Sequence, residues 1–216
     1  MRLFSRKIFR TTNRLNELFS CLISKIFLRV RLSFLNVDKW HISATYYCRP
    51  YKKKIVNLAN LIHSDIVIEF GCGLGEICSR INTKTAIGVD SDSSIIRAAK
   101  NINQGIQYLV LDVINDKDKF RHFISTLPKK KNKLFIAVNW LHCYDSKIAT
   151  EFTSELLSLE NSYLIIDKYT RAELSKAGKA GKSNKFDHQP NEVFKNYNFI
   201  VIENVDEVRD LVLIQN

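Results

Sequence analysis

Glycines and carboxylates near the middle of the chain have the types and spacing needed to bind an adenosine-bearing cofactor. Gly71, Gly73 and Gly75 alternate with other residues directly after a short apolar run that ends in Glu69. Glycines in this arrangement let the backbone turn sharply and come close to a ligand. Asp90 follows at about 20 residues, the distance at which a carboxylate is expected to accept hydrogen bonds from ribose hydroxyls. These residues predict a cofactor pocket built by a strand, a glycine-rich turn and a following helix.

The residue at position 76 decides which cofactor the pattern fits. A dinucleotide fingerprint has its last glycine at this position, and this chain has Glu76 there. A carboxylate at the N-terminus of the following helix would repel the pyrophosphate that binds at such a place. S-adenosyl-L-methionine carries a sulfonium and an ammonium group and no phosphate, so Glu69 and Glu76 would attract it. The sequence therefore predicts S-adenosyl-L-methionine as the cofactor.

Four apolar runs, each followed by a polar residue, predict the strands that position these side chains. Residues that are apolar on both faces are typical of buried parallel strands. The carboxyl ends of parallel strands meet at one edge of a sheet, so Asp112 and Asn139, after the third and fourth runs, are expected beside Asp90. The four runs are residues 66–68, 86–89, 106–111 and 134–138.

Helix and strand patterns alternate over the rest of the chain, which favours an open, doubly wound sheet. A short acidic link separates the last two predicted strands and favours a hairpin. We therefore predict an α/β protein with a mostly parallel, seven-stranded, Rossmann-like sheet. Further helices are expected at residues 50–61, 94–101 and 150–159, and further strands at 163–166, 197–202 and 209–214.

Four short motifs carry a resemblance to a known family. They are Glu69-x-Gly71-x-Gly73-x-Gly75, Gly88-Val89-Asp90, Leu111-Asp112-Val113 and Asn139-Trp140-Leu141-His142. Over roughly residues 50–216 the chain resembles the class I S-adenosylmethionine-dependent methyltransferases. These motifs specify the cofactor well and hardly constrain the methyl acceptor.

The resemblance implies a role for each polar residue. The glycine loop would lie under the methionine part of the cofactor. Asp90 would bind the ribose hydroxyls, and Asp112 would lie near the adenine amino group. Asn139 would sit beside the methyl-transfer centre. The last two strands of this family pair antiparallel, which agrees with the predicted hairpin.

Two histidines are candidates for the base that removes a proton from a hydroxyl acceptor. Histidine is the usual choice for this task near neutral pH. His142 lies just past the fourth predicted strand and close to Asn139, and His188 lies in the loop before the sixth strand. Each also has a structural interpretation, as a packed or surface side chain.

The acceptor is the least constrained part of the prediction. No proline follows Asn139, so methylation of nucleic-acid amines, which uses an Asn/Asp-Pro-Pro-aromatic signature, is disfavoured. A weaker resemblance to small methyltransferases of bacterial surface-glycan gene clusters implies O-methylation of a sugar or lipid-linked glycan in polysaccharide biosynthesis. A soluble small-molecule or RNA methyltransferase and a catalytically silent docking module remain alternatives. The short motifs that carry the resemblance to the glycan-cluster methyltransferases are Asp38-Lys39-Trp40-His41, Arg49-Pro50-Tyr51, Phe186-Asp187-His188 and residues 206–209.

The N-terminal segment, residues 1–36, is both basic and apolar, and the catalytic domain is expected to follow it at residues 37–216. It carries eight Lys or Arg and one acid, Glu17, whereas the remainder carries 25 bases and 21 acids. The pattern predicts an amphipathic helix on an anionic membrane surface, so we expect a cytoplasmic protein, peripheral on the inner face of the membrane. A helix packed on the domain and a mitochondrial targeting segment remain open. The apolar residues at helical spacing are Leu15, Leu18, Phe19, Leu22 and Ile26.

Cysteines and polar loops suggest fewer functions. The chain has five cysteines, an odd number, and no Cys-x-x-Cys motif. We therefore expect reduced thiols in a cytosolic protein and no metal site. The aromatic segment 37–50 either caps the pocket or packs against the sheet. Residues 170–190 form a long basic loop, interpreted either as a substrate-binding loop or as a mobile surface loop.

Overall fold

A computed structural model describes residues 2–35, 37–169, 188, 190–203, 205 and 209–216, with side chains from residue 15 onward. Seven strands form one sheet in the order β3-β2-β1-β4-β5-β7-β6, parallel except for β7, which runs antiparallel to both neighbours. The predicted seven-stranded α/β fold and the terminal hairpin are confirmed. The strands are β1 (Ile66–Phe70), β2 (Thr85–Asp90), β3 (Gln107–Val110), β4 (Lys133–Ala137), β5 (Ser162–Tyr169), β6 (Asn198–Ile202) and β7 (Arg209–Gln215).

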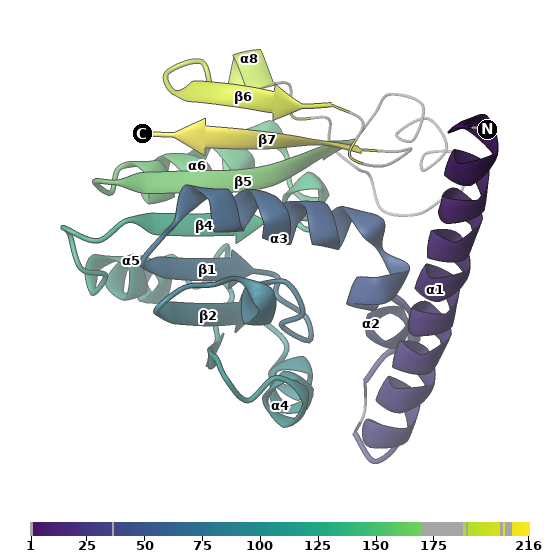
Figure 1. Ribbon diagram of the computed structural model, residues 1–216. Helices are drawn as coiled ribbons and strands as arrows, with labels where there is room; N and C mark the ends of the chain where they lie inside the picture. Colours follow the sequence, from purple (N-terminus) through teal and green to yellow (C-terminus); the bar gives the residue numbers. More distant parts are fainter. Residues whose placement is uncertain (1, 36, 170–187, 189, 204, 206–208) are drawn as a thin grey trace.

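Helices cover both faces of the sheet (Figure 1). Side chains of α3 pack with one apolar cluster, and those of α5, α6 and α8 pack with another that includes the opposite sides of β1 and β4. β1 and β4 are buried at every position, which explains their continuous apolar runs. The helices are α1 (Arg2–Arg31), α2 (Lys39–Ser43), α3 (Pro50–Ile62), α4 (Ser93–Ile102), α5 (Lys117–Ser125), α6 (Ser146–Leu157) and α8 (Pro190–Val193).

Local details differ from the sequence prediction at several places. The glycine loop is followed by turns and the 3-10 segment η2 (Cys78–Arg80), not by an α-helix, because β2 already begins at Thr85. Helix α6 begins four residues earlier than predicted, because the Asp145 side chain caps it by accepting from the Ile148 amide. The short helix α2 and the helix α5 were not predicted.

Helix α1 is attached to the domain by a narrow polar and aliphatic strip. Cys21 forms a disulfide with Cys48, in the 3-10 segment η1 (Tyr46–Cys48), and Ser24 shares a 2.8 Å hydrogen bond with Thr45. The expectation that all five cysteines are reduced is therefore wrong, because the fold brings these two, 27 residues apart in sequence, into bonding contact. Leu28 and Leu32 complete the contact, packing with Leu74 and Ala98.

The apolar stripe of α1 faces away from the protein. With 3.6 residues per turn, these side chains lie on the side opposite to Cys21 and Leu28. The helix therefore does pack on the domain, but through its other side. Among the described residues, no helix combines the length and apolar character needed to cross a bilayer. The stripe residues are each at least 50% exposed, namely Leu15, Leu18, Phe19, Leu22, Ile23, Ile26, Phe27 and Val30.

Candidate functional site

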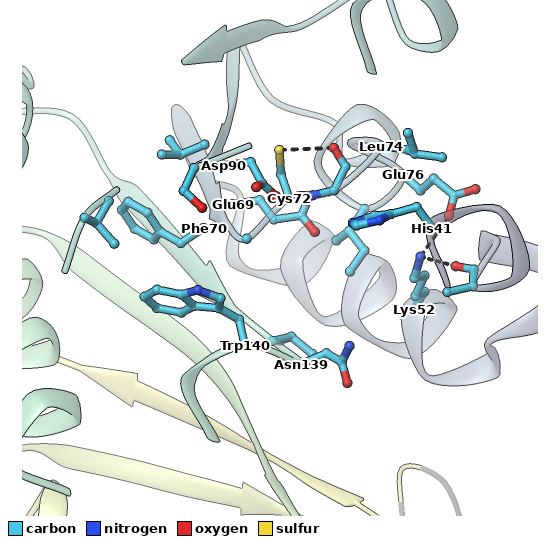
Figure 2. Close-up of a pocket in the computed structure, with 18 of the residues that line it drawn as sticks. His41, Lys52, Glu69, Phe70, Cys72, Leu74, Glu76, Asp90, Asn139 and Trp140 are labelled. Carbon is cyan, nitrogen blue, oxygen red and sulfur yellow. Dashed lines mark hydrogen bonds and ion pairs between the residues drawn. The ribbon is translucent and has the colours of Figure 1, made fainter. Parts of the chain in front are cut away.

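A pocket opens at the carboxyl ends of the parallel strands, where the sequence predicts the cofactor (Figure 2). Its lining comes from β1, β2, the glycine loop, the segments after β3 and β4, and the aromatic segment before α3. Gly75 is part of the loop but does not reach the cavity. The predicted site residues that line the pocket are Glu69, Gly71, Gly73, Asp90, Asp112 and Asn139.

The glycine loop is closely covered by side chains from other elements. Gly71 and Gly73 have positive φ angles, of 63° and 52°, which side-chain-bearing residues seldom adopt. A Cβ atom at Gly71 would lie 2.9 Å from the ring of Trp140, and one at Gly73 would lie 3.0 Å from the ring of His41. Glycine is therefore required here both by the backbone conformation and by the space.

Two of the predicted carboxylates brace the backbone around the pocket. Asp90 accepts the Gly73 amide at 3.0 Å and the Asp92 amide at 3.1 Å, so it holds the glycine loop against the end of β2. Asp112 accepts the amides of Ile114 and Asn115. Both carboxylates keep lone pairs for a ligand, since a carboxylate can accept about four hydrogen bonds.

Glu69 is the most deeply buried acid of the pocket. Burial raises the pKa of its carboxyl to about 7, although hydrogen bonds from Cys78 and the nearby Lys52 charge act in the opposite direction. One of its oxygens accepts the Cys78 amide at 3.0 Å. A cation placed beside Glu69 would favour the ionised carboxylate.

Glu76 connects the pocket to the segment that precedes α3. Its two oxygens accept the Tyr46 amide at 3.0 Å and bind the Lys52 ammonium at 2.8 Å. Lys52 also donates to the carbonyl of Ala44. Glu76 thus neutralises a partly buried lysine instead of adding a free charge to the pocket. A pyrophosphate is disfavoured mainly because, in the described chain, no α-helix directly follows the glycine loop to bind it at its N-terminus.

Asn139 occupies a strained turn at the end of β4. Its φ angle is 60°. Its backbone amide donates to Asp167 at 2.8 Å, and its side-chain oxygen accepts from the Tyr169 hydroxyl at 2.7 Å. The other oxygen of Asp167 accepts from Arg209 at 3.2 Å. The guanidinium of Arg209 also lies 3.8 Å from the centroid of the Tyr51 ring. A buried network therefore fixes the position of Asn139.

The two predicted histidines do not reach the pocket. His142 is 6% exposed, packs edge-on against Tyr169 with the ring centroids 4.6 Å apart, and does not line the cavity. His188 is 2% exposed, and its Nε2 lies 3.1 Å from the carbonyl oxygen of Leu141. The expectation that both lie at the crevice fails because both side chains are buried, His142 beside Tyr169 and His188 beside the carbonyl of Leu141. A catalytic role for either one stays a prediction.

A different histidine lies at the pocket. His41, in α2, has its Nδ1 2.9 Å from a carboxylate oxygen of Asp38, and its backbone amide donates to the other oxygen at 2.9 Å. Its opposite ring edge, with Nε2, faces the glycine loop beside Gly73. The sequence places His41 in an aromatic segment, and the Asp-x-x-His spacing by itself does not show that the two side chains pair. Asp38 caps α2, which is why the two side chains meet.

The basic loop at residues 170–190 lies almost entirely outside the described residues, so neither interpretation of it is tested. His188 is one of its described positions.

Comparison with known proteins was made at the levels of sequence and structure. No protein-family model matches the chain. Solved structures of three methyltransferases superpose on most of it. Magnesium protoporphyrin IX methyltransferase ChlM from Synechocystis PCC 6803, with bound S-adenosylhomocysteine, is 13% identical and matches over 77% of this chain and 84% of that one, with a TM-score of 0.56. The N-methyltransferase NodS from Bradyrhizobium japonicum WM9, with the same compound, is 12% identical and matches over 89% of this chain and 98% of that one, with a TM-score of 0.61. The plantazolicin methyltransferase BpumL, also with this compound, is 14% identical and matches over 93% of this chain and 99% of that one, with a TM-score of 0.57.

The chain has the class I methyltransferase fold. The sequence comparison finds protein 235L of Invertebrate iridescent virus 6, described as a methyltransferase, at 27% identity over 108 residues. The match covers 39% of this chain and 41% of the viral protein, so the chain spans less than half of that relative. The methyltransferase fold places its cofactor-side crevice where the acid-lined pocket lies, at the carboxyl ends of the strands.

Proposed function

We propose that this protein is an S-adenosylmethionine-dependent methyltransferase. The observation that carries the proposal is a pocket lined by Glu69, Asp90 and Asp112 at the carboxyl ends of successive strands of this fold. Carboxylates suit a cofactor that carries a sulfonium and an ammonium group. Lys52 is the cation in the lining whose charge could attract a phosphate, and Glu76 already binds it. The absence of an α-helix directly after the glycine loop, within the described chain, also speaks against a dinucleotide.

In the proposed complex the roles follow the strand order. Asp90 binds the ribose hydroxyls, Asp112 lies near the adenine amino group, and Asn139 lies beside the transferring methyl group. Glu69 and the glycine loop contact the methionine part. These assignments are supported by the shared lining of one cavity and by the network that holds Asn139 in place.

His41 is the best-placed base for an acceptor hydroxyl. Asp38 orients the ring through Nδ1, which leaves Nε2 on the pocket side as a proton acceptor. His142 and His188 are buried beside Tyr169 and Leu141, so these contacts would have to open before either histidine could act.

We further propose O-methylation of a sugar or lipid-linked glycan at a membrane surface. The outward apolar stripe of α1 supports this part, because an apolar face flanked by Lys25, Arg29 and Arg31 fits a bilayer with anionic headgroups. Helices α1 and α2 lie at the edge toward which the parallel strands point (Figure 1). Binding through the stripe would therefore bring the pocket edge close to the membrane.

Calorimetric titration tests the cofactor assignment. We expect micromolar binding of S-adenosylhomocysteine and no binding of NAD. Asp90→Ala should weaken binding by roughly ten- to a hundredfold, because a charge-assisted pair of about 1.5–3 kcal/mol is lost. Asp90→Asn is the matched variant, since it keeps an acceptor for the Gly73 amide but removes the charge. Wild-type protein that binds neither compound would refute the proposed function and favour a silent docking module.

A further inference from the structure

A second cavity lies between α1 and α2, beside the cofactor pocket. Its volume is about 270 Å³, whereas one ordered water needs only roughly 10–15 Å³. Half of its lining is cationic, and none of it is acidic. The lining residues are Lys25, Arg29, Lys39, Trp40, Ile42 and Ser43.

The lining of this cavity brings three cations together without an acidic residue among them. In the part of the chain that the structure describes, none of Lys25, Arg29 and Lys39 forms a side-chain hydrogen bond or ion pair. Asp38, next to Lys39 in the sequence, has both carboxylate oxygens engaged by His41. Like charges held together repel one another, so a multivalent anion would be stabilised here.

The cavity wall is held in a defined position. On α1, the Cys21–Cys48 disulfide and the Ser24–Thr45 hydrogen bond flank Lys25. Arg29 is one helical turn further along the same face, four residues on. A cation presented by an anchored helix loses little backbone freedom when an anion binds.

The cavity and the cofactor pocket share one wall. Trp40 lines both and is 49% exposed, and the Arg49 guanidinium lies 5.0 Å from the centroid of its ring. The next residue, His41, faces the glycine loop. One acceptor molecule could therefore place an anionic group in the cavity and a hydroxyl near His41.

We infer that the α1–α2 cavity binds a phosphate group and that the methyl acceptor is a phosphate-bearing sugar. Lys25, Arg29 and Lys39 would contact the phosphate oxygens, and Trp40 would contact the sugar or carrier that bears them. A soluble sugar phosphate and a lipid-linked one share this chemistry, and the experiment below distinguishes these two sources of the phosphate. The inference rests on the proposed function for the identity of the reaction, but the phosphate site can be tested separately.

The experiment uses full-length protein with inorganic pyrophosphate as the probe, titrated by calorimetry at low ionic strength. The double variant Lys25→Gln/Lys39→Gln should bind pyrophosphate at least about tenfold more weakly than wild type. The double variant Lys53→Gln/Lys100→Gln removes the same charge from exposed positions outside this cavity and should stay within about twofold. Binding of S-adenosylhomocysteine should be unchanged in both.

The outcomes separate the two proposals. No pyrophosphate binding by wild type, or equal loss in both double variants, would overturn the phosphate site even if S-adenosylhomocysteine binds. If the wild type does not bind S-adenosylhomocysteine, the proposed function is overturned instead.

A second arm identifies the source of the phosphate, using cosedimentation with vesicles that contain phosphatidylglycerol. If Lys25→Gln/Lys39→Gln lowers pyrophosphate affinity but leaves cosedimentation intact, the site serves an acceptor phosphate. If both fall, the site also binds lipid headgroups, which supports a lipid-linked source. If only cosedimentation falls, the cations belong to a membrane-binding surface and the inference is wrong.

Discussion

At the scale of single residues, the pocket combines two kinds of acid. Asp90 and Asp112 stand at strand ends with access to the cavity, and both also brace nearby amides. Glu69 is enclosed by protein and is held close to neutrality by burial. Carboxylates of one pocket thus differ in their environment, because two are open to the cavity and one has a pKa that burial raises to about 7.

The titration of Glu69 should appear in the stability of the unliganded protein. The pKa of its carboxyl rises from 4.5 to about 7 on folding. The folded state therefore favours the protonated carboxyl. The contribution of Glu69 to the free energy of unfolding is fully present below pH 4.5 and is lost as the pH rises through about 7. The loss amounts to at most about 3 kcal/mol.

Glu69→Gln keeps the shape of the side chain and an acceptor for the Cys78 amide but cannot ionise. Urea unfolding of both proteins between pH 4.5 and 8 measures the effect. The wild type should lose stability relative to the variant over this range. A difference that does not vary with pH would contradict the raised pKa.

The proposed role of His41 predicts a loss of turnover without a loss of cofactor affinity. His41→Ala should lower kcat by roughly 10²–10⁴-fold, the usual contribution of a general base. Methyl transfer to a glycolipid acceptor and titration with S-adenosylhomocysteine provide the two measurements. Added imidazole should restore part of the rate.

His122→Ala is the matched control, since His122 is exposed on α5, away from the pocket lining. If His41→Ala weakens cofactor binding and kcat recovers at saturation, His41 binds the cofactor and is not the base.

At the scale of elements, α1 shows that an amphipathic helix can pack through its less apolar side. Disulfide, hydroxyl and leucine contacts fix that side, and the larger apolar stripe is left in solvent. Exposing eight large apolar side chains on one helix face marks an interaction surface.

The stripe should determine membrane binding. The triple variant Leu18→Gln/Leu22→Gln/Ile26→Gln should lower the partition coefficient onto anionic vesicles by more than about tenfold, since each buried CH₂ contributes ~0.8 kcal/mol. Its melting temperature should stay near that of wild type, because all three side chains are at least half exposed.

Leu61→Gln/Ile200→Gln is the control, because these side chains are exposed on other elements. Unchanged vesicle binding by the triple variant would refute the membrane part of the proposal. A change of oligomeric state instead would indicate that a second copy covers the stripe.

At the scale of the whole molecule, one buried ion pair joins the hairpin, the helix layer and the crevice. Arg209 at the start of β7 binds Asp167 of β5 and stacks on Tyr51 of α3, while Asp167 positions the amide of Asn139. Arg209 is 5% and Asp167 is 2% exposed. The last strand of the chain therefore helps to set the geometry of the pocket.

Removing one partner of the Arg209–Asp167 ion pair should lower the stability of the protein strongly. Arg209→Met leaves the Asp167 carboxylate buried without its cation and should lower the free energy of unfolding by about 3–5 kcal/mol. Asp167→Asn/Arg209→Met removes both charges, keeps an acceptor for Asn139, and should recover part of the loss. Urea denaturation of the three proteins tests this. A double variant that is no more stable than Arg209→Met would contradict the charge argument.

Much of the fold and part of the site could be predicted from the sequence, because they depend on local patterns. Apolar runs that end in Glu69, Asp90 and Asn139 indicate buried parallel strands, and strand ends in one sheet must meet at one edge. The glycine spacing requires a sharp turn next to the first strand. These features set the sheet and the position of the pocket without any knowledge of long-range contacts.

The remaining features depend on which distant segments meet, and only the tertiary structure decided them. The burial of His142 and His188, the approach of His41 to the glycine loop and the Cys21–Cys48 bond leave no periodic signal in the sequence. Periodicity likewise identifies the apolar stripe of α1 but not which side of the helix packs. That side is chosen by contacts with residues many positions away, whose burial and bonding outweigh the local pattern.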